Sequence, residues 1–261
     1  MPMRGGLTNA MAAPDIWIVS VDEPLFYGRL YSQLARACSD RIKGAIIVRN
    51  PETSTFSRLF REVIYRLRFW GIRGSCYAVV ASLWSRSFGK GNLARTCRNN
   101  GIAVNYTDSL AEAGECLRRE RAGVVLCSFP RRVPKECLMA VPGGWVNTHC
   151  GPLPNYRGLD APFWCLHNEE AYLAVTLHYM AEEFDTGPII AQRQIANSGE
   201  PYFVILRKLF AVALDMHTEF VRTAHPSFSE ASSQDPSAGS YYGRPEPSLG
   251  AAFRRRGGRF V

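Results

Sequence analysis

The chain has 261 residues, of which 46% are hydrophobic and 11% aromatic, and it carries a formal net charge of +8. This is ample for the core of one large domain or two small ones, while no apolar run approaches the roughly 20 residues that span a bilayer. The basic balance suits anionic partners such as phosphates, nucleotides or nucleic acid, although the Arg residues within 58–75 and 251–261 also fit a solvated surface.

Strands and helices alternate through the first part of the chain. Short apolar runs predict strands at 16–19 and 42–48, and residues 20–40 hold a loop and a helix between them. This order is typical of a βαβ unit. The basic, aromatic stretch 54–89 predicts two helices broken near Gly71 to Gly74. A core-facing helix pair and a surface for a membrane or a partner both remain open for this stretch.

The same alternation continues to residue 150. Residues 122–129 are apolar throughout, as expected of a parallel strand that is covered on both faces. The other elements predicted in this part are a helix and a short strand on either side of Gly101 within 92–106, a helix over 108–122, a short helix over 133–140 and a strand over 144–150.

The pattern changes after residue 158. Strands predicted at 171–180 and 187–196 follow each other closely enough to pair as a hairpin. Helices are predicted over 161–169 and 201–224, and the second is long and amphipathic, with Pro201 tolerated in its first turn.

These elements predict an α/β fold, a Rossmann-like open sheet that is mostly parallel and carries an antiparallel hairpin near its C-terminal end. We expect a flexible extension over 1–14, one globular domain over 15–225, a linker over 226–240 and a short tail over 241–261. The eight Cys include no C-x-x-C pair, so no metal site is expected. With no secretory leader in view, free thiols in a cytoplasmic protein are expected.

The turn after the first strand is where a doubly wound sheet usually binds a phosphate. Here it reads SVDEPLFYG, without the G-x-G-x-x-G or G-x-x-x-x-G-K-[ST] pattern. Asp22 and Glu23 would repel a phosphate, and Pro24 removes a backbone N–H donor. A Rossmann dehydrogenase or a P-loop NTPase is therefore not expected.

Polar side chains that suit carbonyl chemistry follow the strand at 144–150. Asn147 and His149 are two apart, so both project to one face near the carboxyl end of the strand, where open α/β sheets bind ligands. An amide and an imidazole side by side can polarise a carbonyl and shuttle a proton. Asp185, in the turn between the next two strands, can orient the imidazole. Cys150 is expected to be a bystander.

A lone Asn-x-His is common and more often structural, so the surrounding sequence decides. NTHCGPLPNYRGLDAPFW together with VTLHYMAEEFDTGPIIAQ resembles the folate-dependent formyltransferases, most strongly over 120–195 and more weakly from residue 15. The resemblance implies a formyltransferase-type fold with its catalytic domain over 15–225, and catalytic roles for Asn147, His149 and Asp185. The family loop SLLPxxRG corresponds to GPLPNYRG, with Gly151 where Ser is usual and with the substrate-loop residues Pro152, Pro154, Tyr156, Arg157 and Gly158.

The resemblance also implies 10-formyltetrahydrofolate as the formyl donor. It places the pterin of this donor against residues 128–134 and the loop before Asp185. The matching positions are Phe129, Arg132, Val133 and Glu182, although Pro130 and Arg131 differ from typical family sequences.

The acceptor is expected to be a small-molecule amine, foremost a nucleotide-linked amino sugar. The first turn lacks the Gly-rich sequence with which the family binds glycinamide ribonucleotide. The roughly 37 residues after the long helix are too few for the β-barrel domain of the tRNA enzymes. A methionyl-tRNA formyltransferase-like enzyme, a 10-formyltetrahydrofolate hydrolase and a non-catalytic folate- or RNA-binding module remain alternatives, and a homodimer is left open.

Overall fold

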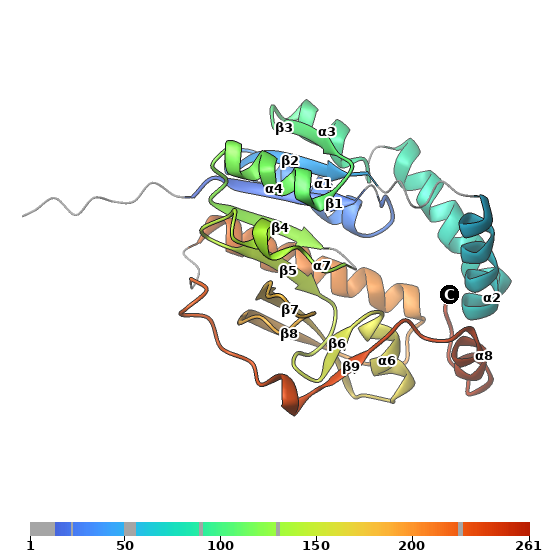
Figure 1. The fold of residues 1–261 in the computed structure, drawn as a ribbon. Helices are drawn as coiled ribbons and strands as arrows, with labels where there is room; N and C mark the ends of the chain where they lie inside the picture. The colour runs from blue at the N-terminus through green and yellow to red at the C-terminus, as the bar shows by residue number, and fades with distance from the viewer. Residues whose placement is uncertain (1–13, 22, 50–55, 89–90, 129–130, 224–226) are drawn as a thin grey trace, which may run out of the picture.

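The computed structural model describes residues 14–21, 23–49, 56–88, 91–128, 131–223 and 227–261. The strands of its main sheet are β1 (Ile16–Val21), β2 (Ile42–Val48), β3 (Ala103–Thr107), β4 (Val124–Ser128), β5 (Trp145–His149), β7 (Tyr172–Tyr179) and β8 (Ile189–Ala196). They lie in the order β3-β2-β1-β4-β5-β7-β8 (Figure 1). Strands β1 to β5 are parallel, and β7 pairs antiparallel with both β5 and β8. The predicted mostly parallel sheet with an antiparallel hairpin is confirmed.

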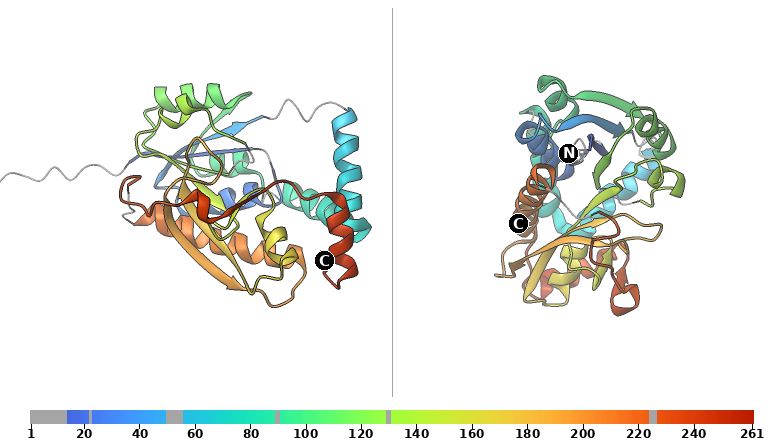
Figure 2. Two further views of the ribbon diagram at one scale, coloured as in Figure 1. Left: turned by 60° about the horizontal axis from the view of Figure 1, so that its bottom comes forward. Right: turned by 90° about the vertical axis from the view of Figure 1, so that its left-hand side faces the viewer.

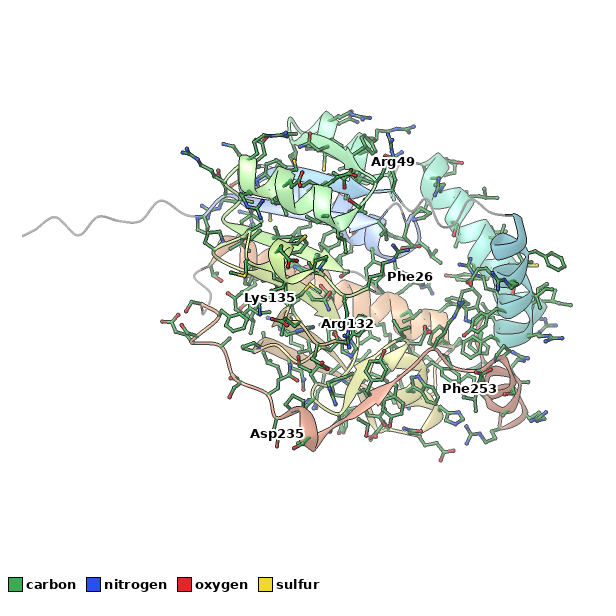
Figure 3. The ribbon with its side chains drawn as sticks, viewed as in Figure 1. Phe26, Arg49, Arg132, Lys135, Asp235 and Phe253 are labelled. Carbon is green, nitrogen blue, oxygen red and sulfur yellow. The ribbon has the colours of Figure 1, made fainter. Side chains whose placement is uncertain are left out.

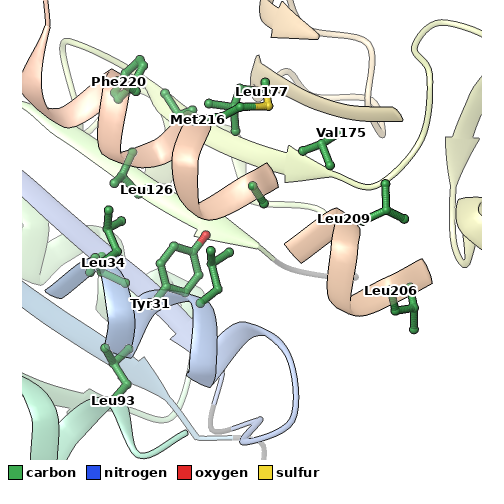
Figure 4. Packing of buried hydrophobic residues seen from close by; sticks show 14 of the residues in the cluster. Tyr31, Leu34, Leu93, Leu126, Val175, Leu177, Leu206, Leu209, Met216 and Phe220 are labelled. Carbon is green, nitrogen blue, oxygen red and sulfur yellow. The ribbon is translucent and has the colours of Figure 1, made fainter. Parts of the chain in front are cut away.

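Helices cover both faces of this sheet, as Figure 2 shows from two further sides. One face carries α1 (Tyr27–Ala37), α3 (Leu93–Asn99) and α7 (Tyr202–Arg222), and the other carries α4 (Leu110–Arg119) and α5 (Lys135–Leu138). Apolar side chains of α1 and α7 meet those of β4 and β7 in the larger of two cores, where Leu34, Leu126 and Leu177 are buried (Figure 4). Helices thus cover both faces of the sheet, and the ends of its strands are where a site can form.

A long bent helix stands at one end of the sheet. α2 (Phe56–Ser87) is interrupted at Gly71, whose φ of 74° is left-handed, and packs against α8 (Pro247–Arg255) (Figure 1). The break falls where the sequence predicted it, because Gly adopts this conformation without strain. Phe69 and Ala78 are buried, whereas Ile72 and Trp84 are exposed. The helix therefore faces the core on one side and presents apolar side chains to solvent on the other.

The C-terminal part of the chain folds back over the domain. β6 (Tyr156–Gly158) and β9 (Ser240–Tyr242) form a small parallel sheet, and α6 (Ala161–His167) follows β6. Ser232 of the predicted linker bridges Ile189. No local pattern in the sequence predicts β6, β9 or α8, because these short elements depend on contacts between distant segments.

The proposed N-terminal extension falls outside the described residues except for Pro14. In the part of the chain that the structure describes, every helix is too short or too polar to cross a bilayer.

Candidate active site

The structure brings the three predicted catalytic residues together at the carboxyl end of β5. Asn147 and His149 are both buried, with 6% and 7% of their surfaces exposed. Asp185, in the loop between β7 and β8, adopts a left-handed φ of 55°. One of its oxygens lies 3.5 Å from His149 Nδ1 and the other lies 3.4 Å from Asn147 Nδ2.

His178 is a fourth member of the cluster, to which the sequence alone assigned no role. It is the register partner of Asn147 across the antiparallel β5–β7 pair. Its Nε2 lies 3.1 Å from Asn147 Nδ2 and 3.4 Å from an oxygen of Asp185, and its Nδ1 contacts the Tyr179 carbonyl at 2.9 Å. A prediction that the 144–150 strand pairs with the 171–180 strand would have found it, because opposed residues share a face.

Asp185 is held as a carboxylate by the groups around it. Burial alone would raise the pKa of Asp185, but the two imidazoles and the Gly158 backbone N–H, which donates to Asp185 at 2.8 Å, outweigh burial and hold the pKa below its usual range. Asp185 therefore stays negatively charged at neutral pH and can stabilise a proton on His149.

The His149 ring lies between two acceptors. Its Nε2 contacts the Tyr156 carbonyl at 2.5 Å, while Nδ1 faces Asp185. Burial lowers the pKa of His149, against the opposing effect of the Asp185 charge. A Cβ added at Gly151 would lie 2.7 Å from Nε2, so the missing side chain at this position leaves room for the ring. Nε2 must exchange the Tyr156 carbonyl for a substrate atom before it can take part in chemistry.

The predicted substrate loop, residues 152–158, is held by contacts from several segments. Tyr156 donates its hydroxyl to Glu170 at 2.5 Å and stacks on Tyr242, with ring centroids 5.0 Å apart. Arg157 donates to the Pro236 carbonyl at 2.9 Å.

The backbone of the loop is also closely packed. Pro152 accepts from the Tyr156 N–H at 3.1 Å, and Pro154 follows a cis peptide bond. A Cβ at Gly158 would meet the Tyr242 carbonyl at 2.2 Å. The predicted stiff loop therefore owes its order to the C-terminal segment as well as to its prolines.

Two hollows meet at Asn147 and Asp185. The larger is a cavity of about 240 Å³ between the cluster, α2 and α7. The smaller is lined by His178, Arg132, Glu182 and neighbouring residues, and Figure 3 labels Phe26 of the first and Arg132 of the second. Asn147 Oδ1 is buried and has no hydrogen-bond partner among the described residues, so one end of the amide is left for a ligand.

The proposed donor-binding residues are only partly gathered at the smaller hollow. Arg132 lies over the Phe184 ring at 5.4 Å from its centroid, and Glu182 pairs with Lys135 at 2.6 Å. The Val133 side chain is buried in the core, so only its backbone is left for a ligand. Phe129 lies outside the described residues.

The first turn binds its own carboxylate. Glu23 accepts hydrogen bonds from the backbone N–H groups of Leu25, Phe26 and Tyr27, at 2.7, 2.9 and 3.0 Å. These are the amides at the start of α1 that would otherwise bind an anion.

Cys150 borders the larger cavity, and burial raises the pKa of its thiol to about 12, which agrees with a bystander role.

Known proteins resemble the chain in both sequence and fold. The model of the formyl transferase family matches residues 90–197. A methionyl-tRNA formyltransferase from Syntrophus aciditrophicus is 33% identical over 119 residues, which are 45% of this chain and 38% of that protein. The chain thus spans well under half the length of this curated relative.

Solved structures share the fold over most of the chain. Glycinamide ribonucleotide transformylase 1 from Symbiobacterium toebii has a TM-score of 0.57 at 17% identity, over 84% of this chain and 92% of that one. A sugar N-formyltransferase from a Shewanella species has a TM-score of 0.53 at 15% identity, over 88% and 76%. HypX from Aquifex aeolicus, in complex with tetrahydrofolic acid, has a TM-score of 0.53 at 15% identity, over 91% and 31%.

Proposed function

We propose that this chain, whose residues 90–197 match the model of the formyl transferase family, transfers a formyl group from 10-formyltetrahydrofolate to a primary amine. The observation that carries the proposal is the contact of Asp185 with both His149 and Asn147 at the junction of two hollows. An amide donor, an imidazole and a buried carboxylate are the groups that amine attack on a carbonyl requires.

Each member of the cluster has a separate task in this reaction. Asn147 exchanges one of its Nδ2 contacts, at 3.4 Å to Asp185 or 3.1 Å to His178, for a hydrogen bond donated to the oxygen of the formyl group, where negative charge develops. His149 takes the proton of the attacking amine and passes it toward the departing nitrogen, and burial favours this by keeping the imidazole neutral before the step. Asp185 stabilises His149 while it carries the proton. His178 holds Asp185 and Asn147 in place.

The smaller hollow supports folate as the formyl donor. The bound donor would supply the electrophilic formyl carbon. Arg132 and Glu182 line this hollow beside the unpartnered Oδ1 of Asn147, and its volume of about 10 Å³ means that it would have to widen to admit the pterin. The structural relative from Aquifex aeolicus is in complex with tetrahydrofolic acid, which also favours this ligand.

The larger cavity supports a small amine, foremost the amino sugar of a nucleotide-linked acceptor. A volume of about 240 Å³ suits a single ring and does not enclose a macromolecule. The likeness in fold to a sugar N-formyltransferase favours the same class. A methionyl-tRNA acceptor is the second candidate, since the sequence relative is a methionyl-tRNA formyltransferase.

The test is formylation by the purified chain. Incubation with 10-formyltetrahydrofolate and a panel of nucleotide-linked amino sugars should yield an acceptor heavier by one formyl group.

Asn147→Ala should slow the reaction on the order of 10²–10³-fold, the usual effect of losing an oxyanion donor. Formylation of methionyl-tRNA alone would replace the sugar by the second candidate, and release of formate without any acceptor would indicate a hydrolase. Full activity of folded Asn147→Ala and His149→Ala variants would overturn the mechanism.

A further inference from the structure

Helix α2 carries most of the large apolar side chains that the described residues expose. Nine of the fifteen such side chains lie within 60–88. Single exposed apolar residues are normal on a protein surface, but a contiguous group marks a place where another molecule binds. This group stands at one end of the sheet, where α2 lies (Figure 1).

The second half of α2 has an inner face that is fixed to the domain. Its Ala78 and Ser85 are buried, and Ser85 donates its hydroxyl to the Pro24 carbonyl at 2.7 Å. The Tyr77 ring packs on Phe203 of α7, with ring centroids 4.9 Å apart. Because these contacts hold the inner face, the side chains on the opposite side of the helix point to solvent in the folded chain.

That opposite side is apolar where an ordinary surface helix is polar. Ile72, Val79 and Leu83 follow each other at intervals of seven and four residues, so they form one stripe along the helix. Ile72 is 74% exposed and Leu83 is 61% exposed. The exposed apolar side chains of this half, with the one just after the helix, form the outer apolar face, which consists of Ile72, Val79, Val80, Leu83, Trp84 and Phe88.

Arginines border the outer apolar face on both sides. At about 100° per residue, Arg86 lies about 60° to one side of Leu83 around the helix, and Arg73 lies about 80° to the other. Both arginines are exposed. The chain has no Asp or Glu between Glu62 and Asp108. The second half of α2 is therefore basic as well as apolar.

A hollow of about 460 Å³ adjoins this face between α2, α1 and α7. Val80 and Trp84 line it together with Arg29 of α1 and Arg207 of α7. Both of these arginines are exposed, and the described lining of the hollow holds no carboxylate. Two more cations thus lie beside the outer apolar face, where they can bind the phosphate of a lipid head group.

Charge complementarity decides which partner fits the outer apolar face. Two copies joined by it would bring their arginines together, without an acidic residue in 63–107 of either copy to pair with them. A nucleic acid would meet the cations, but the stripe between them is aliphatic and offers no surface on which bases stack. An anionic bilayer fits both properties, because its head groups attract arginines while apolar side chains lie at the boundary with the acyl chains.

We propose that the outer apolar face of α2 docks this chain on the surface of a bilayer that contains anionic lipids. The second half of α2 then lies in the plane of the interface, with its apolar side chains below the head groups. Arg73, Arg29 and Arg207 contact lipid phosphates. Docking requires neither the formyl donor nor the acceptor, so it is independent of the proposed function.

Vesicle binding by the purified full chain tests the proposal. The vesicles contain either phosphatidylcholine alone or equal parts of phosphatidylcholine and phosphatidylglycerol, and flotation separates bound from free protein. Binding to the mixed vesicles should be roughly tenfold tighter than binding to the neutral ones. It should also weaken as the salt concentration rises, because salt screens the attraction between the arginines and the head groups.

Two variants separate the apolar part of the surface from the charged part. Ile72→Gln combined with Leu83→Gln should weaken binding to the mixed vesicles roughly tenfold or more, because two side chains no longer gain by leaving water. Arg73→Gln should weaken it roughly fivefold. The matched controls are Tyr172→Gln, at an exposed apolar residue of β7, and Arg119→Gln, at an exposed arginine of α4. Both controls should bind as the unmodified chain does.

Cys76 reports on the same surface by spectroscopy. It lines the hollow beside Val80 and is the one exposed thiol among the eight cysteines. A polarity-sensitive fluorophore attached to Cys76 should shift its emission to the blue with the mixed vesicles and not with the neutral ones.

All variants should keep the melting temperature of the unmodified chain within about 3 °C. No binding to the mixed vesicles, unchanged binding by the folded double variant, or unchanged emission from labelled Cys76 would each overturn the proposal. A dimer in vesicle-free solution that the double variant separates would also overturn it, since the face would then join two copies of the chain. Tighter binding to single-stranded RNA than to the mixed vesicles would instead assign the arginines to a nucleic acid.

Discussion

Asp185→Asn is the sharpest single test of the proposed chemistry. The amide keeps the size of the side chain but removes the charge that faces His149 at 3.5 Å and His178 at 3.4 Å. A hydrogen bond to a charged group contributes about 1.5–3 kcal/mol. Losing it when His149 carries the proton predicts a fall in kcat/KM of roughly 10- to 150-fold, since about 1.4 kcal/mol corresponds to a factor of ten in rate.

The same variant should change the pH profile in a defined direction. Burial lowers the pKa of His149 below 6.5, and the Asp185 charge opposes that shift. Removing the charge therefore lowers the His149 pKa further. Because the neutral imidazole accepts the proton, activity is lost on acidification as the ring becomes protonated. The acidic limb of the kcat/KM profile should consequently lie at lower pH in Asp185→Asn than in the unmodified chain.

The assay is the initial rate of tetrahydrofolate release between pH 5 and 8. Asp215→Asn, an exposed carboxyl on α7, serves as the control and should match the unmodified chain throughout. Thermal unfolding of both variants separates loss of chemistry from loss of fold. A folded Asp185→Asn variant with a rate within about threefold of normal and an unshifted acidic limb would refute the role of Asp185.

Two further predictions concern the surroundings of the cluster. Gly151→Ala should lower the free energy of unfolding by about 1–3 kcal/mol in urea titrations, because its Cβ would lie 2.7 Å from both His149 Nε2 and the Ala161 Cβ; an unchanged midpoint would contradict this packing. Burial lowers the pKa of His217 to about 3. Below about pH 6.5 the unfolded chain therefore takes up a proton on His217 that the folded chain does not, and the free energy of unfolding falls as the pH drops toward 3. The stability difference between the unmodified chain and His217→Leu should therefore shrink by about 1.4 kcal/mol from pH 7.5 to 5.5, and a pH-independent difference would argue against a neutral buried imidazole.

Local patterns predicted the main sheet, and together with the resemblance to formyltransferases they singled out Asn147, His149 and Asp185, which the structure brings together. Asn147 and His149 share a face because strand side chains alternate, and Asp185 stands at a turn that a two-strand pattern predicts. His178 was missed because it joins Asn147 only through the register of β5 against β7. That register depends on strand pairing across the sheet, which the alternation within one strand does not specify.

The larger cavity could not be predicted because its walls come from separate parts of the fold. Tyr27 starts α1, Trp70 lies on α2, Asp160 precedes α6 and Tyr202 starts α7. Of these four, only Asp160 lies within the quoted stretch NTHCGPLPNYRGLDAPFW, and there Asp160 before a helix reads as an ordinary N-cap. The structure shows instead a left-handed backbone and no capping hydrogen bond from the Asp160 side chain.

The net charge of the whole chain differs in sign from the charged side chains that line the larger cavity, so it does not predict the ligand of that cavity. Several Arg side chains are bound within the fold, as Arg244 is to Glu62 and Arg157 to the Pro236 carbonyl. The net charge of +8 already subtracts every carboxylate, so the surplus cations lie outside the described lining of the larger cavity. The charge of +8 is therefore compatible with a cavity whose fixed charges are carboxylates. A basic net charge therefore does not predict that the ligand of a particular cavity is anionic.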